Sequence, residues 1–265
     1  MRFVAFLVFA TCIGGCARTP PPAAVSAPSR PASLGKAGGS GSGVEIYFVR
    51  HGETIANATG RYNGRTLNTL SATGEAQARS VAQALHGISF DAAIVSPSLR
   101  AEVTAAETLS EHGLTATIWP EFNECCTQHG AARLKSASKR LGLGTTVTVP
   151  ISLASVLRID PTDNRLYAPA NYADGLVQTQ IASSRIRTLL GHEHKPSGVY
   201  RLLIIGHSAQ GSRFLDLLLD RKPIGDIELK NGEIVILRAV PGGAFKLSSK
   251  IDNPNQSRRV DPRMR

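Results

Sequence analysis

Short apolar runs alternate along the chain with segments in which apolar residues recur at helical spacing. The runs at 44–49 and 200–205 are apolar except for one charged residue each, Glu45 and Arg201, and they contain β-branched residues, which is typical of strands buried on both faces. Residues 72–85 instead place apolar side chains at 78, 81, 82 and 85, on one face of a helix. The expected strands are 44–49, 91–95, 115–119, 200–205, 233–239 and 244–248, and the expected helices are 72–85, 99–109, 176–190 and 210–219. Because strands alternate with helices, we predict an α/β fold, a three-layer α/β/α sandwich with a mostly parallel central sheet.

The first 15 residues form a different kind of segment. They combine Arg2, a short apolar run and small residues, which is the pattern of a secretory signal peptide, and the run is too short to span a bilayer. Ile13-Gly14-Gly15-Cys16 resembles the bacterial lipobox, which implies cleavage before Cys16 and its acylation with chains such as palmitate. We therefore expect a lipoprotein at the extracytoplasmic face of the cell membrane. An ordinary secreted protein, cleaved nearby, is the alternative.

The remaining boundaries follow from composition. Residues 16–43 are rich first in Pro and then in Gly and Ser, which is typical of a tether. Residues 44–249 are expected to form one domain, with the less regular stretch 127–195 as a variable insertion, and 250–265 form a basic tail. Much of the formal net charge of +10 lies in the two ends of the chain. This favours solvated tails over attraction to an anionic lipid or polymer.

Composition also excludes several classes of protein. The 42% apolar content and a mean hydropathy of −0.06 exclude a polytopic membrane protein and a wholly disordered chain. With 5% aromatic residues, recognition of nucleic acid by stacking is disfavoured, and no nucleic-acid partner is expected. The adjacent Cys125 and Cys126 are expected to be packed thiols, because Cα atoms about 3.8 Å apart are too close for an unstrained disulfide. A redox switch at this position is the alternative.

Two of the expected strands end directly in a histidine. Tyr47-Phe48-Val49 leads into Arg50-His51-Gly52, and Leu203-Ile204-Ile205 leads into Gly206-His207-Ser208. In open α/β sheets ligands bind beyond the carboxyl ends of the strands. We therefore expect His51 and His207 to converge on one site.

These residues belong to a longer series of motifs. In chain order the motifs are RHGETIAN at 50–57, GRYNGR at 60–65, LSATGEAQA at 70–78, SPSLRA at 96–101, FNE at 122–124, GHS at 206–208 and KNGEI at 230–234. Their order resembles that of the histidine phosphatase superfamily, in its phosphoglycerate-mutase-like branch. The resemblance is dense over 44–110, moderate over 199–240 and nearly absent over 127–195.

The resemblance implies a role for each residue of the site. His51 would attack phosphorus and carry the phosphoryl group, since an imidazole is neutral yet basic near pH 7. Arg50 and Arg100 would bind the non-bridging oxygens with their planar donor groups. His207 and Asn57 would add further hydrogen-bond donors.

A carboxylic acid completes this chemistry. By the resemblance, Glu124 would protonate the leaving oxygen and then take a proton from the attacking water, and Glu121 is the competing candidate. No cofactor and no metal are expected, because arginine and histidine supply the positive charge. His192-Glu193-His194 is a weak metal candidate, since no third ligand is close in sequence.

Together these features favour a membrane-anchored extracytoplasmic phosphatase that hydrolyses phosphate monoesters of a small substrate through a phosphohistidine. Two alternatives remain open. One is phosphoglycerate-mutase-type transfer, in which a second phosphorylated molecule replaces water. The other is a non-catalytic lipoprotein that binds a phosphorylated ligand.

Overall fold

The computed structural model describes residues 43–127, 135–138, 140–161, 163–192, 198–240 and 242–256. These residues lie in one compact unit, Gly38–Arg265. The predicted signal peptide, the tether with Cys16 and the last nine residues of the basic tail lie outside the described residues.

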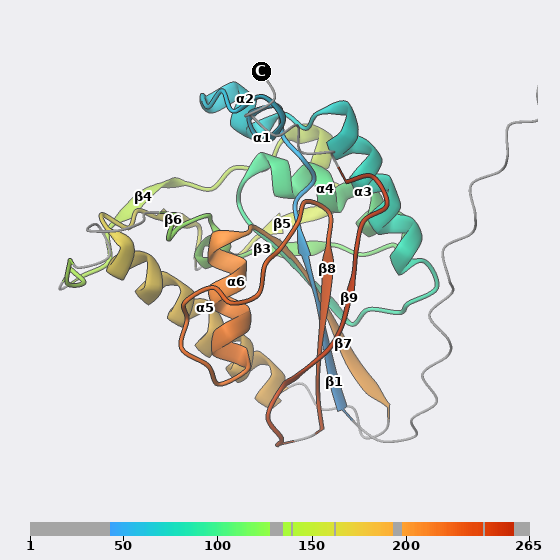
Figure 1. Cartoon of the computed structure of the whole chain (residues 1–265). Coiled ribbons are helices and arrows are strands. Elements are labelled where there is room, and N and C mark those ends of the chain that lie inside the picture. The colour runs from blue at the N-terminus through green and yellow to red at the C-terminus, as the bar shows by residue number, and fades with distance from the viewer. Residues whose placement is uncertain are drawn as a thin grey trace, which may run out of the picture. The chain divides into compact units, whose positions relative to one another are not determined.

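A seven-stranded sheet forms the centre of this unit, in the order β5-β3-β2-β7-β1-β8-β9 (Figure 1). The strands are β1 (Gly43–Arg50), β2 (Ala92–Val95), β3 (Ala116–Ile118), β5 (Leu157–Ile159), β7 (Val199–Gly206), β8 (Ile234–Ala239) and β9 (Lys246–Ile251). Neighbouring strands from β5 to β1 run parallel, whereas β8 and β9 are antiparallel to their neighbours. The predicted mostly parallel sheet is confirmed.

Helices cover both faces of the sheet. α3 (Ala72–Leu85) and α4 (Leu99–Glu111) lie on one side, and α5 (Tyr172–His192) and α6 (Ala209–Leu218) lie on the other (Figure 1). Alternate residues of β1 point to opposite faces of the sheet. Ile46 and Phe48 pack in the core under α5 and α6. Tyr47 and Val49 pack in the core under α3 and α4. Because β1 is buried on both faces, its sequence is almost continuously apolar. The three-layer architecture is confirmed.

Part of the expected insertion belongs to the central layers. β5 pairs in parallel with β3 at the edge of the sheet, and Ala182 and Ile186 of α5 are fully buried in the core. The rest includes β4 (Leu143–Thr146) and β6 (Arg165–Tyr167), which form a separate antiparallel pair, and the 3-10 turns η1 (Pro120–Phe122) and η3 (Ile151–Leu153). A strand of three residues shows no periodicity that sequence analysis can use.

Two short helices follow β1 and were not expected. α1 (Ile55–Thr59) and α2 (Gly64–Asn68) each begin with a capping box, in which the side chains of Thr54 and Asn63 accept backbone hydrogen bonds. Helices of five residues are too short to show an amphipathic repeat, and their caps are the only sequence signal they carry.

The carboxyl-terminal region packs further along the chain than the expected boundary at 249. β9 reaches Ile251, and the buried Asn253 donates hydrogen bonds to the backbone oxygens of Gln77 and Gly232. Among the helices of the described ranges, none combines the length and the hydropathy needed to cross a membrane.

Candidate active site

The ends of β1 and β7 bring the two histidines together. The strands are parallel neighbours in which Arg50 pairs with Gly206, so the next residue of each strand emerges at the same edge of the sheet. The amide of His51 donates to the carbonyl oxygen of Gly206 at 2.9 Å. As a result the rings of His51 and His207 lie edge to face, with centroids 5.2 Å apart.

Arg100, in the first turn of α4, lies between the two imidazoles. Its Nε is 3.3 Å from Nε2 of His51, and its Nη2 is 3.2 Å from Nδ1 of His207. Its Nη1 donates to Oδ1 of Asn68 at 3.1 Å, which anchors the guanidinium from the side of α2. Two ring nitrogens and a guanidinium therefore face a common point.

The hydrogen bonds of His51 determine which nitrogen can react. Nδ1 lies 2.7 Å from the carbonyl oxygen of Gly52, and because a carbonyl only accepts, Nδ1 carries the proton. The lone pair is then on Nε2, which points toward Arg100. Burial lowers the pKa of His51 well below its usual value, and the charges of Arg50 and Arg100 lower it further. Nε2 is thus an unprotonated nucleophile near neutral pH.

His207 is held in the opposite tautomer. Its Nδ1 faces a donor, Nη2 of Arg100, and so must accept, which places the proton on Nε2. That nitrogen lies 2.6 Å from Oγ of the buried Ser96, at the end of β2. Burial lowers the pKa of His207 well below its usual value, and the charges of Arg100 and His51 add to the effect.

Glu124 lies near Nδ1 of His207, the ring nitrogen that Arg100 also faces. Its Oε2 is 3.9 Å from Nδ1 of His207, and its Oε1 accepts the backbone N–H of Gln210 at 3.0 Å. The side chain is 23% exposed, so a proton can exchange with solvent. Burial raises the pKa of Glu124, while the N–H of Gln210 and the charge of Arg100 oppose this effect. This carboxyl group retains its proton to a higher pH than an ordinary glutamate.

Glu121, the competing candidate, points elsewhere. Its carboxyl group is fully buried and pairs with Arg185 of α5 at 3.0 Å. Glu124, and not Glu121, shares the space around His207.

The two other predicted anion ligands flank this centre. Arg50 ends β1, donates from Nη1 to the carbonyl oxygen of Leu229 at 2.7 Å, and lowers the pKa of both histidines through its charge. Asn57 uses its Oδ1 to accept from Thr54 and from Nδ2 of Asn231. Its amide nitrogen is therefore the end of the side chain that can donate to an anion.

Close backbone packing fixes the loop that follows β1. A Cβ on Gly74 would lie 1.9 Å from the carbonyl oxygen of Glu53, and a Cβ on Gly52 would lie 2.6 Å from the oxygen of Gly74. Only glycines permit this approach of α3 to the loop. The N–H of Gly52 also donates to Oγ1 of Thr104 on α4 at 3.0 Å. The backbone that follows His51 is therefore held by two helices, α3 and α4.

Four residues that hold the side chains or backbone of the site were not predicted from the sequence: Asn68, Ser96, Gln210 and Asn231. Asn231 donates to the carbonyl oxygen of His51 at 3.0 Å, and the other three contact Arg100, His207 and Glu124 as described above. Ser96 and Asn231 lie within the motifs SPSLRA and KNGEI, and this was the one sequence feature that could have indicated a role for them. Asn68 and Gln210 carried none.

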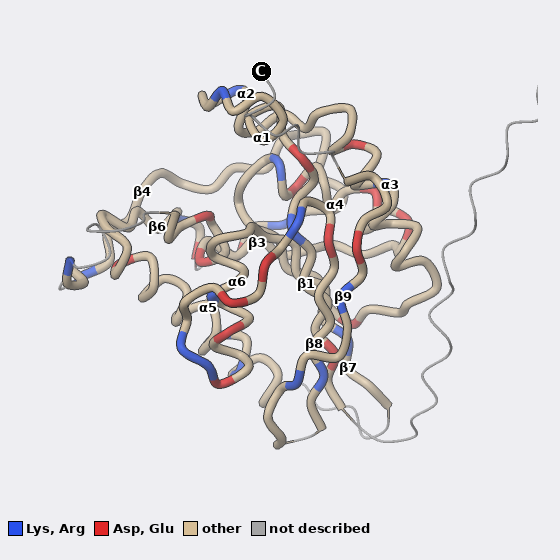
Figure 2. The backbone as a smooth tube through the Cα atoms, viewed as in Figure 1, with Lys and Arg blue, Asp and Glu red and all other residues tan. Residues whose placement is uncertain are grey.

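Three further charged residues, Glu53, Arg61 and Arg65, follow β1, and they differ in their surroundings. Glu53 is buried and accepts from Ser71 at 2.7 Å, so it supports the loop, whereas Arg61 and Arg65 are exposed. Figure 2 shows basic positions on α2, beyond the carboxyl ends of β1 and β7. Within the described ranges, no three histidine, cysteine, aspartate or glutamate side chains form a group that could hold a metal ion.

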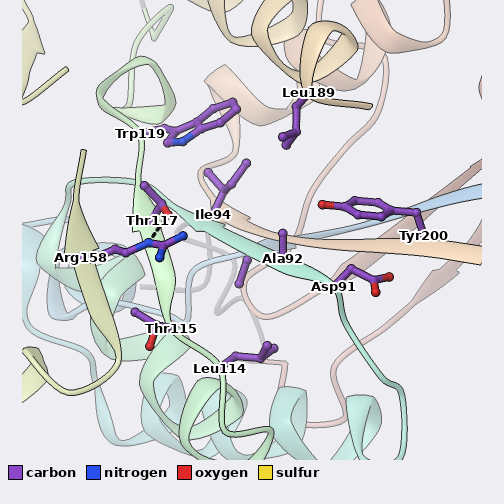
Figure 3. A pocket seen from close by; sticks show the side chains of 11 residues that line it. Asp91, Ala92, Ile94, Leu114, Thr115, Thr117, Trp119, Arg158, Leu189 and Tyr200 are labelled. Carbon is purple, nitrogen blue, oxygen red and sulfur yellow. Dashed lines mark hydrogen bonds between the residues drawn. The ribbon is translucent and has the colours of Figure 1, made fainter. Parts of the chain in front are cut away.

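A separate pocket of about 490 Å³ lies near the amino-terminal ends of the parallel strands, and Figure 3 shows the side chains that line it. It is lined by residues near the beginnings of the parallel strands, among them Asp91, Thr115 and Tyr200. Trp119, Arg158 and Leu189 complete its wall. The histidine pair follows the carboxyl ends of the strands, so this pocket is not part of the site.

Comparisons with known proteins agree with this geometry. Residues 46–136 match the family model of the histidine phosphatase superfamily (branch 1). Over 81 residues the chain is 42% identical to the adenosylcobalamin/alpha-ribazole phosphatase of Escherichia coli (strain K12). This match covers 31% of the chain and 40% of that relative, so the chain spans less than half of the relative's length.

Solved structures extend the similarity to most of the fold. The alpha-ribazole phosphatase from Shigella flexneri has a TM-score of 0.53 at 18% identity, over 82% of this chain and 100% of that chain. The phosphoglycerate mutase from Bacillus anthracis str. Sterne has a TM-score of 0.51 at 19% identity, over 79% and 93%. At these identities the similarity concerns the fold alone. Residues 46–136 thus match the histidine phosphatase superfamily (branch 1), and the described chain has a phosphoglycerate-mutase-like α/β fold.

Proposed function

We propose that this protein is a phosphatase that hydrolyses phosphate monoesters through a phosphohistidine on His51. The observation that carries the proposal is the arrangement of His51: Gly52 holds its Nδ1 proton, so that Nε2 faces Arg100 as an unprotonated nucleophile. An anion bound by Arg100 would replace the contacts that this guanidinium makes with the two imidazoles. Its phosphorus would then lie within reach of Nε2.

The reaction proceeds in two halves. In the first, Nε2 of His51 bonds to phosphorus, the ester P–O bond breaks, and Glu124 gives its proton to the leaving oxygen. In the second, water attacks the phosphoryl group while ionised Glu124 takes a proton from it. The N–P bond breaks, inorganic phosphate leaves, and His51 and Glu124 return to their starting states.

The positive groups stabilise the charge on the phosphoryl oxygens. Arg50 and Arg100 bring permanently charged donors, each worth about 3 kcal/mol of transition-state stabilisation when well oriented. His207 can donate from Nδ1 once that nitrogen is protonated, and a neighbouring phosphate dianion favours this protonation. Ser96 accepts the other ring proton, so both nitrogens of the imidazolium would be satisfied.

The test uses hydrolysis of an aryl phosphate by the full chain. We expect turnover by the wild-type protein, a fall of about a thousandfold or more in His51→Ala, and little change in His86→Ala. His86 is the matched control, because it is an exposed histidine that pairs with Glu111 on the protein surface. Rapid quenching should trap a phosphorylated wild-type protein. Equal turnover by the wild-type protein and His51→Ala would exclude the proposal, and ligand binding without turnover would favour a non-catalytic protein.

The same preparation distinguishes a phosphatase from a mutase. We expect release of inorganic phosphate from phosphate monoesters and no net interconversion when 3-phosphoglycerate is supplied with a bisphosphorylated primer. Isomerised phosphoglycerate without release of phosphate would favour mutase-type transfer.

We further propose that Cys16 anchors the protein by lipid at the extracytoplasmic face of the cell membrane. The support is in the sequence: the lipobox-like Ile13-Gly14-Gly15-Cys16 follows an apolar run, and a stretch rich in Pro, Gly and Ser precedes β1. When the full chain is expressed in a bacterium, it should partition into the detergent phase, and Cys16→Ser should move it to the aqueous phase. Equal partitioning of the two proteins would contradict the anchor.

A further inference from the structure

Two thiols lie directly beside the proposed acid. Cys125 and Cys126 follow Glu124 in sequence, are both free, and are 6% and 4% exposed. Their Sγ atoms are 2.7 Å apart, which is longer than the S–S bond of about 2.05 Å but within reach of bond formation by small side-chain movements. The function proposed above uses neither thiol.

The pair is linked to the acid through the backbone. The backbone N–H of Cys125 lowers the pKa of Glu124, as the smallest of the effects on that carboxyl group. Cys126 has a φ of 63°, a left-handed conformation that is uncommon for a residue other than glycine. The backbone at the two cysteines therefore has a specific geometry, and the N–H that acts on Glu124 is part of it.

α5 encloses the two sulfurs from one side. A Cβ on Gly175 would lie 2.8 Å from Sγ of Cys126, so a glycine is needed for this approach. Oγ1 of Thr179, one turn later, lies 3.5 Å from Sγ of Cys125 and 3.9 Å from Sγ of Cys126. Little space remains in which the two side chains could separate.

The two thiols differ in acidity. The hydrogen bond from Cys125 lowers the pKa of Cys126, and Thr179 and the charge of Arg213 act in the same direction. The same hydrogen bond, together with burial, raises the pKa of Cys125. Cys126 is therefore the thiol that ionises first, and a thiolate is the form that oxidants attack.

We propose that Cys125 and Cys126 form a redox modification site, at which hydrogen peroxide converts the two thiols into a vicinal disulfide and impairs the acid function of Glu124. The modification itself depends only on the thiols, whereas its effect on catalysis rests on the proposed function. Peroxide is the suitable class of oxidant because it is small enough to reach two cysteines that are only 4–6% exposed.

The chemistry balances in two steps. The Cys126 thiolate attacks one oxygen of the peroxide, the O–O bond breaks, and the hydroxide that leaves is protonated to water, which gives a sulfenic acid. The Cys125 sulfur then attacks Sγ of Cys126, the S–O bond breaks, and the Cys125 proton leaves with the hydroxide as a second water. Two thiols and one peroxide thus give one disulfide and two waters. A dithiol reductant reverses the change by thiol–disulfide exchange.

Closure of the disulfide affects Glu124 because the ring includes the peptide bond between the cysteines. Cα atoms of adjacent residues are about 3.8 Å apart, below the usual range for disulfide-bonded cysteines, so the backbone has to rearrange. The N–H of Cys125 is attached to this ring and would move relative to the carboxylate of Glu124. The oxidised protein would then protonate the leaving group poorly.

The modification can be tested without reference to activity. Full-chain protein is treated with hydrogen peroxide, alkylated, digested with trypsin and analysed by mass spectrometry. Cleavage at arginine isolates residues 101–133, and this peptide contains Cys125 and Cys126 but neither Cys12 nor Cys16. We expect it to lose two hydrogens, and to regain them and accept two alkyl groups after dithiothreitol. A peptide that is fully alkylated after peroxide, or oxidised only to sulfinic or sulfonic acid, would overturn the proposal.

Activity measurements test the effect on Glu124. We expect peroxide to slow hydrolysis of an alkyl phosphate at least about tenfold, an aryl phosphate much less, and dithiothreitol to restore both rates. Cys126→Ser and Cys126→Ala should be insensitive to peroxide, and their thermal unfolding shows whether they fold. A disulfide that leaves the alkyl phosphate rate unchanged would overturn the regulatory part. If the wild-type protein hydrolyses neither substrate, the proposed function fails, while the peptide measurement still decides the modification.

Discussion

At the scale of single residues, His51 and His207 lie in similar surroundings but have opposite tautomers. Both are buried beside Arg100, and burial lowers the pKa of each. The difference lies in the second contact: Gly52 offers a carbonyl oxygen to Nδ1 of His51, whereas Ser96 offers a hydroxyl to Nε2 of His207. One ring thereby presents a lone pair for the proposed attack on phosphorus, and the other presents a nitrogen that can become a donor.

The pKa shifts of His51 and Glu124 predict the pH dependence of catalysis. His51 must be unprotonated, and its lowered pKa keeps it so at acidic pH. Glu124 must be protonated in the first half-reaction, and its raised pKa extends that condition toward neutrality. The value of kcat/KM should therefore rise through the lowered pKa of His51 and fall through the raised pKa of Glu124. We expect greater activity at about pH 5.5 than at about pH 8.

Glu124→Gln tests which limb of that profile belongs to the acid. We expect the fall at high pH to disappear, with a loss of about 100-fold or more for an alkyl phosphate and a much smaller loss for an aryl phosphate. The reason is that an aryl oxide leaves readily without a proton. Glu121→Gln is the control, since Glu121 pairs with Arg185 and not with His207. Equal losses for the two substrates in Glu124→Gln would argue against an acid role.

At the scale of elements, α5 holds the turn that carries the acid. Gln178 donates to the carbonyl oxygens of Glu121 and Asn123, at 3.2 and 2.9 Å. Two turns further along α5, the guanidinium of Arg185 lies 4.0 Å from the ring centroid of Trp119, while it pairs with the Glu121 carboxylate. The segment from 119 to 124 is thus held by α5, a helix from the stretch that the family motifs do not cover.

Arg185 also links this turn to the loop between β5 and β6, through Asp160 and Asp163 at 3.0 and 2.6 Å. Arg185→Met should destabilise the protein by about 3 kcal/mol, because it leaves the fully buried Glu121 without its cation. Adding Glu121→Gln should recover much of this loss. The measurement is urea unfolding at neutral pH.

Arg187→Met is the matched control for that variant. Arg187 lies on the same helix but pairs with Asp220 at the exposed surface, so its removal should cost less than about 1 kcal/mol. Similar losses for Arg185→Met and Arg187→Met would mean that burial of Glu121 does not decide the cost.

α4 carries a second buried acid, which the catalytic scheme does not use. Glu102 is 2% exposed, and burial raises its pKa to about 7. A folded-state pKa above the unfolded value of 4.5 means that the folded protein binds the extra proton, so stability falls as pH rises from 4.5 to about 7 and is constant above. Glu102→Gln should remove this loss and stabilise the protein by up to about 3 kcal/mol at about pH 8.

The same variant should bring no gain at about pH 4, where Glu102 is protonated in both states. Glu107→Gln on the exposed side of α4 is the control and should leave the pH dependence of unfolding unchanged. A gain for Glu102→Gln that is equal at both pH values would show that ionisation of Glu102 is not its cause.

Features of the site that depend on local sequence pattern could be predicted, whereas those that depend on the order of strands in the sheet could not. The strands before His51 and His207 are long apolar runs, so their positions and the meeting of the two histidines followed from local pattern and the rule for parallel sheets. The role of Ser96 depends instead on the order of strands. Ser96 reaches His207 because β2, which it follows, lies beside β7 in the sheet. Strand order leaves no trace in a single sequence. The same holds for Gln210, whose contact with Glu124 is made by a backbone group.

At the scale of the whole molecule, binding of an oxyanion should stabilise the fold, because the site is assembled from β1, β7, α4 and the turn before Glu124. Orthovanadate at 100 times its Kd should raise the free energy of unfolding by about 2.7 kcal/mol, a rise of roughly 5–10 °C in Tm. The shift should be lost in Arg100→Met, because Arg100 is the donor that faces both imidazoles. It should persist in Arg158→Met, because Arg158 lines the separate pocket near the amino-terminal ends of the parallel strands. If Arg158→Met abolished the shift and Arg100→Met retained it, the anion site would have to be assigned to that pocket.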